Sequence, residues 1–401
     1  WDNPVKFYFP EFEMYDDYVT KNITIRDILC HRCGLPRHDM VWYYNKYSSK
    51  ELIEKLKYLK PSTQFRYTLQ YQNLMYALAG YLIEKITNKK WYEYIDETIV
   101  KPLEMENTFY NTENAEKIVN RALPYKATSN KIENIPYYYF EHNNTIGAAG
   151  SIYSNAKNML KWIELNLNKG IYNGKEVIST KEITECHTPQ TINRTLLQFG
   201  FKEESFQSYG FGWFIDCYRG HKVLYHGGNI DGFSAMTAFI PSVNTGFTFL
   251  TNCNGTKIQL ILKNILFDLL LGYEPEDWNT RIKEVNRKMI DQAKETISKF
   301  KKSCNKETQM PLELSKYEGI YSHPAYGNIK IIFENDSLIF KSSMGNLPMK
   351  HICTNTFATE LTIDGETLFI PIEFKLTTYG NIESVMIKLE DGIENFVEFR
   401  A

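Results

Sequence analysis

From residue 311 to its end, this 401-residue chain alternates between apolar and polar side chains, which limits the possible folds more than any other feature. Because successive side chains of a strand point to opposite faces of a sheet, the pattern predicts short strands with one buried face. Turn-forming residues separate the runs, at Gly327–Asn328, Glu334–Asp336, Asp364–Gly365 and Tyr379–Asn381. Residues 311–401 are therefore expected to form a small antiparallel β-barrel domain.

Helical spacing is typical of the earlier part of the chain. Apolar side chains recur every three or four positions over Leu74–Leu82, which predicts a helix over residues 73–87. Thr24-x-x-Asp27 and Ser48-x-x-Glu51 have the spacing of helix-capping boxes. These helices are expected to pack on a sheet whose strands come later in the chain.

Ser154 is expected to begin a further helix, which ends at Lys169-Gly170. Strands are expected at four places that combine β-forming residues with turn residues: Tyr209–Asp216, Lys222–His226, Ser234–Ile240 and Gly246–Thr251. Helices packed on an antiparallel sheet predict an α+β domain over residues 1–275.

Charge singles out the segment between these two domains, because residues 278–306 hold nine Lys or Arg against three acidic residues. Its charges are spread around a helical period, which favours a solvated connecting helix within a linker over 276–310. The alternative, a nucleic-acid arm, is disfavoured by a net charge of −2 for the whole chain. We therefore expect small-molecule or peptide-like substrates and no nucleic acid.

Seven cysteines are scattered along the chain, so a disulfide framework is not expected and the cytoplasm is favoured, while export stays open. Cys30-x-x-Cys33 has the spacing of one half of a zinc site or of a redox pair. Because no second pair of ligands lies at a suitable distance in the sequence, helix packing is the favoured role. We expect no metal and no cofactor. Without an apolar run of ~18 residues, no transmembrane segment is expected either.

Two short motifs stand at places where catalytic residues often lie. Tyr71-Gln72-Asn73 comes directly before the expected helix, and His226-Gly227-Gly228 comes at the end of an expected strand, before Asn229. Taken singly, the first motif is explained by helix capping and the second by a turn. Their order in the chain, together with other motifs, carries more weight.

The chain resembles the penicillin-recognising serine hydrolases, the family of class C β-lactamases, DD-peptidases, D-aminopeptidases and related esterases. The resemblance covers essentially the whole chain and ends in a segment similar to a lipocalin-like module. The motifs that carry it are Ile23–Asp39, Phe65–Tyr76, Gly147–Ser154, Tyr209–Trp213, His226–Gly228, and Tyr317–Tyr321 with His323–Gly327.

This resemblance implies a β-lactamase-like fold and amide or ester hydrolysis through an acyl-enzyme. It implies that Tyr71 is the catalytic base and later acid, that Asn73 positions the substrate, and that His226 replaces the usual lysine of a Lys-Thr-Gly motif. Gly227 and Gly228 would let substrate approach the strand, and the N–H of Asn229 would be one oxyanion donor. His31 and His38 are expected to have packing roles.

The family's nucleophile, the serine of Ser-x-x-Lys, is expected upstream of Trp1. Three matches occur within the chain, at Ser154–Lys157, Ser298–Lys301 and Ser303–Lys306, and the last two fall in the basic linker. Ser154 is explained better as a helix cap.

Two functions stay open. The leading one is a serine hydrolase, with an esterase or D-amino-acid peptidase favoured over a β-lactamase because His226 replaces a lysine. The other is an inactive binding homologue that keeps the pocket without the nucleophile. The β module is expected to cover the cleft or to mediate assembly, and a homo-oligomer stays open.

Overall fold

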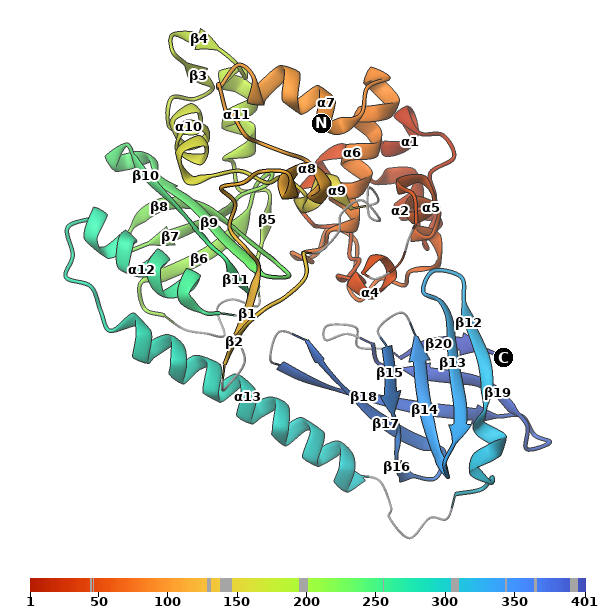
Figure 1. The fold of residues 1–401 in the computed structure, drawn as a ribbon. Coiled ribbons are helices and arrows are strands. Elements are labelled where there is room, and N and C mark those ends of the chain that lie inside the picture. Colours follow the sequence, from red (N-terminus) through yellow and green to blue (C-terminus); the bar gives the residue numbers. More distant parts are fainter. Residues whose placement is uncertain are drawn as a thin grey trace. The chain divides into compact units, whose positions relative to one another are not determined.

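In the computed structural model, the chain forms two compact units (Figure 1). The first unit is Trp1–Arg37 with Lys46–Ile282, and the second is His38–Asn45 with Lys283–Ala401. The structure describes residues 1–43, 45, 47–127, 131–137, 146–194, 201–254, 256–303, 310–342, 345–363, 366–389 and 396–401. The division of the sequence at 275 and 310 stays a prediction.

The first unit contains many short helices and three longer ones, α6, α10 and α12. They are α1 Val5–Tyr8, α2 Asp17–Asn22, α3 Ile25–Leu29, α5 Ser49–Glu54, η1 Leu56–Tyr58, α6 Leu74–Thr87, α7 Trp91–Ile95, η2 Asp96–Val100, α8 Thr112–Glu116, α9 Gly147–Gly150, α10 Ala156–Leu167, α11 Thr180–Cys186, η5 Pro241–Val243 and α12 Ile258–Leu270.

Local sequence accounts for several of these helices. The predicted helix over 73–87 is confirmed as α6, whose apolar face, from Leu74 to Leu82, is buried. Both predicted capping boxes are confirmed: the side chain of Thr24 accepts from the Asp27 N–H in α3, and that of Ser48 from the Glu51 N–H in α5. Reciprocal capping of this kind satisfies N–H groups that a helix end leaves without partners.

Strands of the first unit form one large sheet and two small ones. The large sheet has the order β10-β9-β8-β7-β6-β5, and all of its pairs are antiparallel. The strands are β1 Tyr125–Ala127, β2 Ile132–Asn134, β3 Ile171–Tyr172, β4 Lys175–Glu176, β5 Thr191–Ile192, β6 Glu204–Tyr209, β7 Phe214–Tyr218, β8 His221–Ile230, β9 Phe233–Ile240, β10 Thr245–Thr251 and β11 Cys253–Asn254.

The predicted strand over Tyr209–Asp216 is wrong, because β6 and β7 are two strands joined by a tight turn. In this turn the Gly210 N–H donates to the Trp213 carbonyl over 2.9 Å, and Gly212 has a φ of +76°. A positive φ is easily adopted by glycine and reverses the chain here.

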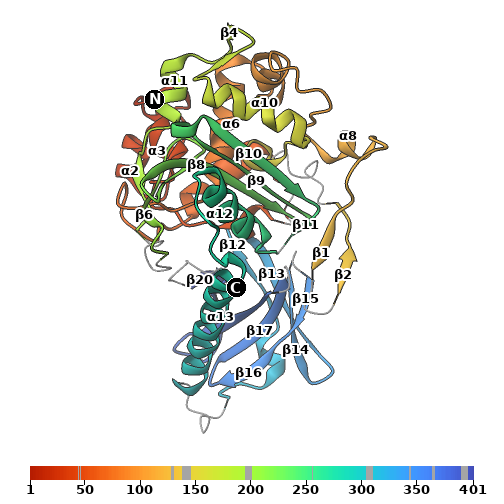
Figure 2. The same cartoon turned by 90° about the vertical axis from the view of Figure 1, so that its left-hand side faces the viewer.

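Helices cover both faces of the large sheet (Figure 2). Successive side chains of β8 point to opposite faces: Val223 and Tyr225 pack in a core with Phe267 of α12, whereas Leu224 packs in a core with Ile163 of α10. Each of these large apolar side chains contributes roughly 1.5–3 kcal/mol when fully buried. The expected α+β fold of helices packed on an antiparallel sheet is thus confirmed.

The expectation that Ser154 begins α10 is wrong by one residue. The N-cap is Asn155, whose side chain accepts from the Asn158 N–H, and the Ser154 hydroxyl instead pairs with that of Thr108 over 3.0 Å. Asn and Ser are about equally good N-caps, so the sequence alone did not separate them.

The second unit contains a long helix and a nine-stranded antiparallel sheet of order β15-β14-β13-β12-β20-β19-β18-β17-β16. Strand β15 also approaches β17, which curls this sheet toward closure, so the predicted small β-barrel is confirmed as a nearly closed one. Its elements are α4 Asp39–Trp42, η6 Leu314–Tyr317, β12 Gly319–His323, β13 Gly327–Glu334, β14 Ser337–Ser342, β15 Gly345–Pro348, β16 Lys350–Cys353, β17 Thr356–Ile363, β18 Glu366–Leu376, β19 Ile382–Ile387 and β20 Val397–Arg400, with α13 Trp278–Ser303 shared between the units.

The expected connecting helix is confirmed as α13. Two predicted turns are confirmed, since Asn335 and Asp336 have positive φ between β13 and β14, and residues 377–381 join β18 to β19. The turn predicted at Gly327-Asn328 is wrong, because these residues begin β13, and Asp364-Gly365 lie outside the described residues.

Five of the cysteines in the described residues are free, including the buried pair Cys30 and Cys33. Burial raises the pKa of Cys33 to about 11, so this thiol stays protonated and is a poor metal ligand or redox group. Cys353 takes part in a disulfide, which removes part of the argument for the cytoplasm that rested on unoxidised cysteines. Cys304 lies outside the described residues.

Candidate active site

Tyr71 lies in the short segment that leads into α6. The side chain that caps this helix is that of Gln72, whose Oε1 accepts from the Met75 N–H over 3.1 Å. Asn73 is the N-cap residue by position, and its carbonyl accepts from the N–H groups of Tyr76 and Ala77. Gln72 is fully buried, so the backbone on either side of Tyr71 is anchored in the core of the unit.

Four rings and one guanidinium surround the half-buried ring of Tyr71. The ring centroid of His31 lies 4.4 Å away, that of His226 6.0 Å, that of Phe214 6.1 Å and that of Tyr209 6.2 Å. The guanidinium carbon of Arg37 lies 5.3 Å from the Tyr71 centroid, which is cation–π distance. Tyr71 and His226, far apart in sequence and both predicted as site residues, therefore lie in one cluster.

Both nitrogens of His226 make hydrogen bonds. Nδ1 lies 2.7 Å from the Gly227 carbonyl oxygen, and because a carbonyl only accepts, Nδ1 carries the proton. Nε2 lies 3.0 Å from the Tyr209 hydroxyl and accepts from it. Burial lowers the pKa of His226, against a smaller opposing effect of the Gly227 hydrogen bond, so the ring is neutral at pH 7.

Two further tyrosines lie in this region: Tyr209 contacts His226, and Tyr76 contacts His31. Tyr209 is 1% exposed, and burial raises its pKa well above the usual value near 10, so it stays a hydrogen-bond donor. The Tyr76 hydroxyl donates to the Leu29 carbonyl over 2.8 Å, and burial raises its pKa as well. Tyr71 and Tyr76 are both partly exposed, and of the three phenols Tyr71 is the one that has the guanidinium of Arg37 over its ring.

His226 to Ile230 form an open part of β8. Pairing of β8 with β7 ends at Tyr225, whereas pairing with β9 continues to Ile230. Within the described chain, no strand pairs with residues 226–230 on the β7 side. Gly227, Gly228 and Asn229, the predicted oxyanion and substrate residues, thus lie on a strand segment that runs past its neighbour, and the Asn229 side chain is held by a 2.7 Å hydrogen bond from Ser234.

None of the described Ser-x-x-Lys serines lies in the ring cluster of Tyr71. Ser154 pairs with Thr108, as described above, and its partner in the motif, Lys157, is exposed. Ser298 and Ser303 lie on α13, and Lys306 lies outside the described residues. The described part of the chain therefore places no Ser-x-x-Lys serine beside Tyr71.

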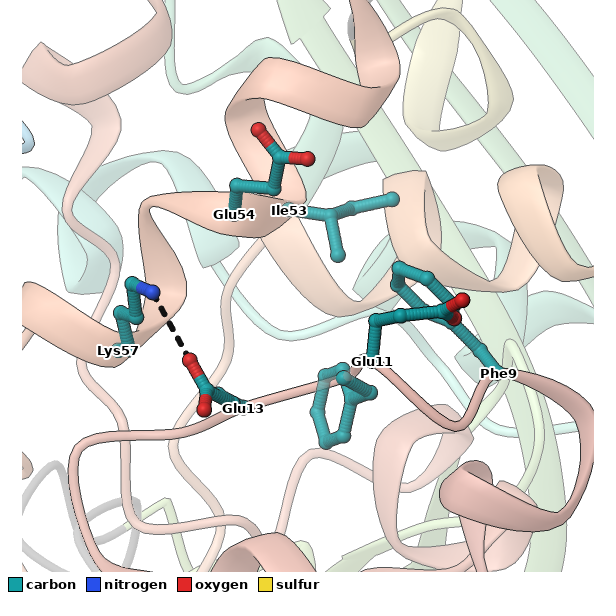
Figure 3. Close-up of a pocket in the computed structure, with 7 residues that line it drawn as sticks. Phe9, Glu11, Glu13, Ile53, Glu54 and Lys57 are labelled. Atoms are coloured by element: carbon teal, nitrogen blue, oxygen red, sulfur yellow. Dashed lines mark hydrogen bonds and ion pairs between the residues drawn. The ribbon is translucent and has the colours of Figure 1, made fainter.

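A hollow of about 30 Å³ lies between α5 and the Phe9–Glu13 segment, where Lys57 donates to Glu13 (Figure 3). Its volume suits one water molecule and is far too small for an amide or ester substrate. In the described residues, no group of three or more His, Cys, Asp or Glu could hold a metal ion. No described helix combines the length and apolar character needed to cross a bilayer.

A family model described as Beta-lactamase matches residues 1–264. The chain belongs to the beta-lactamase family. A second model, a domain of unknown function (DUF3471), matches residues 304–399. The lipocalin-like character expected for this region stays a prediction.

Hydrolases are among the relatives of this beta-lactamase family member. The unguisins hydrolase ungD' of Aspergillus campestris is 28% identical over 415 residues, which cover 98% of this chain and 75% of that protein. The octameric penicillin-binding protein homologue from Pyrococcus abyssi has a TM-score of 0.57 and 18% identity, covering 100% of this chain and 82% of its own. A D-stereospecific amidohydrolase from Streptomyces has a TM-score of 0.51 and 19% identity, covering 63% and 74%. These last two likenesses show the fold.

Sequence reasoning missed four members of the cluster, namely His31, Arg37, Tyr209 and Phe214, the last of which it placed only within an expected strand. It predicted only a packing role for His31, and it placed Arg37 and Tyr209 within motifs without giving them a role. The signal that could have found these three is their position within the segments that resemble the family, Ile23–Asp39 and Tyr209–Trp213.

Proposed function

We propose that this beta-lactamase family member is a serine hydrolase that cleaves an amide or ester through an acyl-enzyme. The observation that carries the proposal is the cluster of Tyr71, His226 and Arg37 beside the open part of β8. A serine hydrolase needs a base near the nucleophile and N–H donors facing the developing oxyanion. Tyr71 would be the base, and the N–H of Asn229 one donor.

Arg37 would supply part of the positive charge that a tyrosine needs to serve as a base near pH 7. Lowering the pKa of a phenol from near 10 to near 7 requires about 4 kcal/mol of stabilisation of the phenolate. His226 does not supply a positive charge, because it is neutral. The guanidinium of Arg37 is always charged and lies over the Tyr71 ring, so it is the cation next to the phenol.

Tyr71 would take up and release one proton in each half of the reaction. The serine oxygen attacks the carbonyl carbon while its proton passes to the Tyr71 phenolate, and Tyr71 then donates this proton to the leaving amine or alcohol. Water then attacks the carbonyl carbon of the acyl-enzyme, its proton passes to Tyr71, and Tyr71 returns this proton to the serine oxygen as the bond to the acyl group breaks. The serine itself is not in the described cluster, so we propose that it belongs to a Ser-x-x-Lys segment outside these 401 residues.

The substrate class follows from the neutral His226. A lysine at this place would attract a substrate carboxylate, and a neutral imidazole does so less strongly. We therefore favour a simple ester or a D-amino-acid amide over a penicillin. The name of one relative, an unguisins hydrolase, supports hydrolysis, and the name of one solved structure, a D-stereospecific amidohydrolase, supports an amide as the substrate.

The test uses the product of the whole gene and a fluorophosphonate probe. Wild type should gain one covalent adduct on a serine, located by peptide mass spectrometry. Tyr71→Phe should react about 100-fold more slowly with an unchanged melting temperature, because the base is lost. Tyr379→Phe, at an exposed turn of the second unit, is the matched control and should react like wild type. An adduct on Ser154 would contradict the assignment of the nucleophile.

The second proposal is a binding homologue without a nucleophile, favoured by the absence of a described Ser-x-x-Lys serine from the cluster. In that case the whole gene product should form no adduct, while a D-amino-acid amide still raises its melting temperature. Labelling of any serine that depends on Tyr71 would exclude this alternative.

Assembly and substrate range form a separate proposal for the second unit. The related penicillin-binding protein homologue is described as octameric, which supports testing this chain for self-association. Removing residues 311–401 should change either the oligomer mass by light scattering or the range of esters cleaved. If neither changes, the proposal is wrong.

A further inference from the structure

His31 lies directly behind Tyr71, in the turn that follows α3. Its side chain is 1% exposed, and its backbone has a φ of +55°, a left-handed conformation that costs a residue other than glycine roughly 1 kcal/mol. Burying a histidine in this backbone conformation costs more free energy than filling the same space with an apolar side chain in a relaxed conformation. Its contacts show what the histidine does at this place.

His31 accepts two hydrogen bonds, one from the residue before Tyr71 and one from the residue after it. The His31 carbonyl accepts from the Gln70 N–H over 2.8 Å, and its Nδ1 accepts from the Gln72 N–H over 3.4 Å. The same imidazole packs against the Tyr71 ring at 4.4 Å, the shortest ring distance in the cluster. One residue thus holds the residue before Tyr71, the residue after it, and the phenol ring itself.

The hydrogen-bond pattern fixes the protonation of His31. Because Nδ1 accepts from an N–H, the single proton of the neutral ring is on Nε2. Nε2 is buried among the rings of Tyr71, Tyr76 and Tyr209, without a hydrogen-bond partner among the described residues. Such a donor costs roughly 1–3 kcal/mol, so a purely apolar side chain would pack here at lower cost.

We propose that His31 is a positioning residue for Tyr71, acting as a neutral acceptor through Nδ1. The inference rests on the proposed function, since it assigns His31 to the alignment of the same base. It goes beyond the packing role expected from the sequence. A charged His31 would carry a proton on Nδ1 and lose the Gln72 bond. Burial, and then the neighbouring His226 and Arg37, hold its pKa well below the ordinary value, in keeping with a neutral ring.

Two substitutions separate the acceptor from the ring. In His31→Asn, Oδ1 takes the place of Nδ1 and asparagine tolerates the left-handed backbone, but the ring is lost and a cavity remains. In His31→Phe, the ring stays and the acceptor is lost. A packing role predicts that Phe is the better replacement, whereas a positioning role predicts that Asn is.

The experiment measures two quantities on the whole gene product. The rate of fluorophosphonate labelling should stay within about 5-fold of wild type in His31→Asn and fall at least 10-fold in His31→Phe, although the melting temperature falls further in the Asn variant. Hydrogen–deuterium exchange of the peptide that contains Gln72 should accelerate in the Phe variant and much less in the Asn variant.

The outcomes distinguish the two proposals. Labelling rates that follow the melting temperatures, with Phe better than Asn, would overturn the positioning role while the hydrolase proposal stands. Wild type that does not label at all would overturn the hydrolase proposal. The exchange rates would then still decide whether His31 holds the Tyr71 segment through Nδ1, and equal exchange in the two variants would overturn that.

Discussion

Gly228 lies on the open part of β8, where a Cβ atom would lie 3.7 Å from the side chain of Ala235. This is an ordinary van der Waals distance. At Gly227 the nearest atom, on Met236, would lie at 3.4 Å, and neither glycine has a positive φ. Packing and backbone conformation therefore do not require glycine at these positions. The proposed approach of a substrate to this strand would require it.

We predict that Gly228→Ala lowers hydrolysis at least 10-fold, by blocking the substrate, while the melting temperature stays within a few degrees of wild type. Gly246→Ala is the contrasting variant, because its Cβ would lie 2.5 Å from Ile163 and 2.8 Å from the Ala238 carbonyl. This second variant should lose stability. Thermal melts and initial rates on both proteins check the prediction, which fails if Gly228→Ala is unstable or fully active.

The sequence predicted that Tyr71 and His226 are site residues because the order of their motifs in the chain resembles that of the family, although each motif alone is explained by a helix cap or a turn. It did not predict that Arg37 is the cation beside Tyr71, because a cation–π contact depends on how a loop folds over a ring. Nor could it show that His226 is neutral, since this follows from burial and not from residue type.

At the scale of elements, α3 is held by a polar network centred on Asp27. The carboxylate of Asp27 is fully buried, bonds to the Thr24 N–H over 2.8 Å and pairs with both Arg32 and Arg66. Burial alone would raise the pKa of Asp27, but the hydrogen bonds from Arg66, Thr24 and Arg32 outweigh it and lower the pKa. Since α3 leads directly into His31, this network also fixes the turn behind Tyr71.

Asp27→Ala should destabilise the protein by about 3 kcal/mol, because it removes a helix cap and leaves two arginines without their partner. Asp16→Ala, which removes only the cap of α2, should cost about 1 kcal/mol. Urea unfolding of the two variants makes the comparison. Equal losses would mean that the arginine pairs of Asp27 contribute nothing measurable.

His187 joins three elements: it follows α11, packs on Phe239 of β9 at 5.1 Å, and pairs through Nε2 with Asn166 of α10 over 2.9 Å. Burial, with a smaller effect of Lys222, lowers the pKa of His187 to about 4. The unfolded chain, with a histidine pKa near 6.5, binds the proton more readily than the folded one. Folding stability therefore falls as the pH drops below 6.5 toward 4.

Between pH 7 and pH 5, wild type should lose about 2 kcal/mol more stability than His187→Gln, which cannot take up the proton. Denaturant unfolding at the two pH values measures the difference. His31 and His226 remain in both proteins, so their own contributions cancel. Parallel pH dependence in wild type and variant would show that His187 does not resist protonation in the folded state.

Element boundaries show where sequence reasoning reached its limit. It identified α6 and both capping boxes because their signals are local. The sequence predicted one strand where the structure has β6 and β7, because apolar residues continue through the turn. The positive φ of Gly212 and the hydrogen bond from Gly210 to Trp213 show that the chain reverses there. Sequence reasoning placed the start of α10 at Ser154 because two adjacent residues had equal capping propensity.

At the scale of the whole molecule, the net charge is close to zero, but two regions of the chain carry net charges of opposite sign. Residues 278–306 carry nine basic against three acidic residues, and residues 311–401 carry seven against thirteen. Each compact unit also has its own apolar core, with Phe267 fully buried in the first and Phe340 in the second. Separate cores permit separate unfolding.

We therefore predict two transitions in differential scanning calorimetry of the 401-residue chain. Phe267→Ala and Phe340→Ala delete the same side chain from α12 and β14, at a cost of roughly 3–5 kcal/mol each. Each variant should lower the temperature of one transition and leave the other unchanged, since its cavity lies in only one core. A single transition that both variants lower equally would show that the two units unfold as one cooperative body.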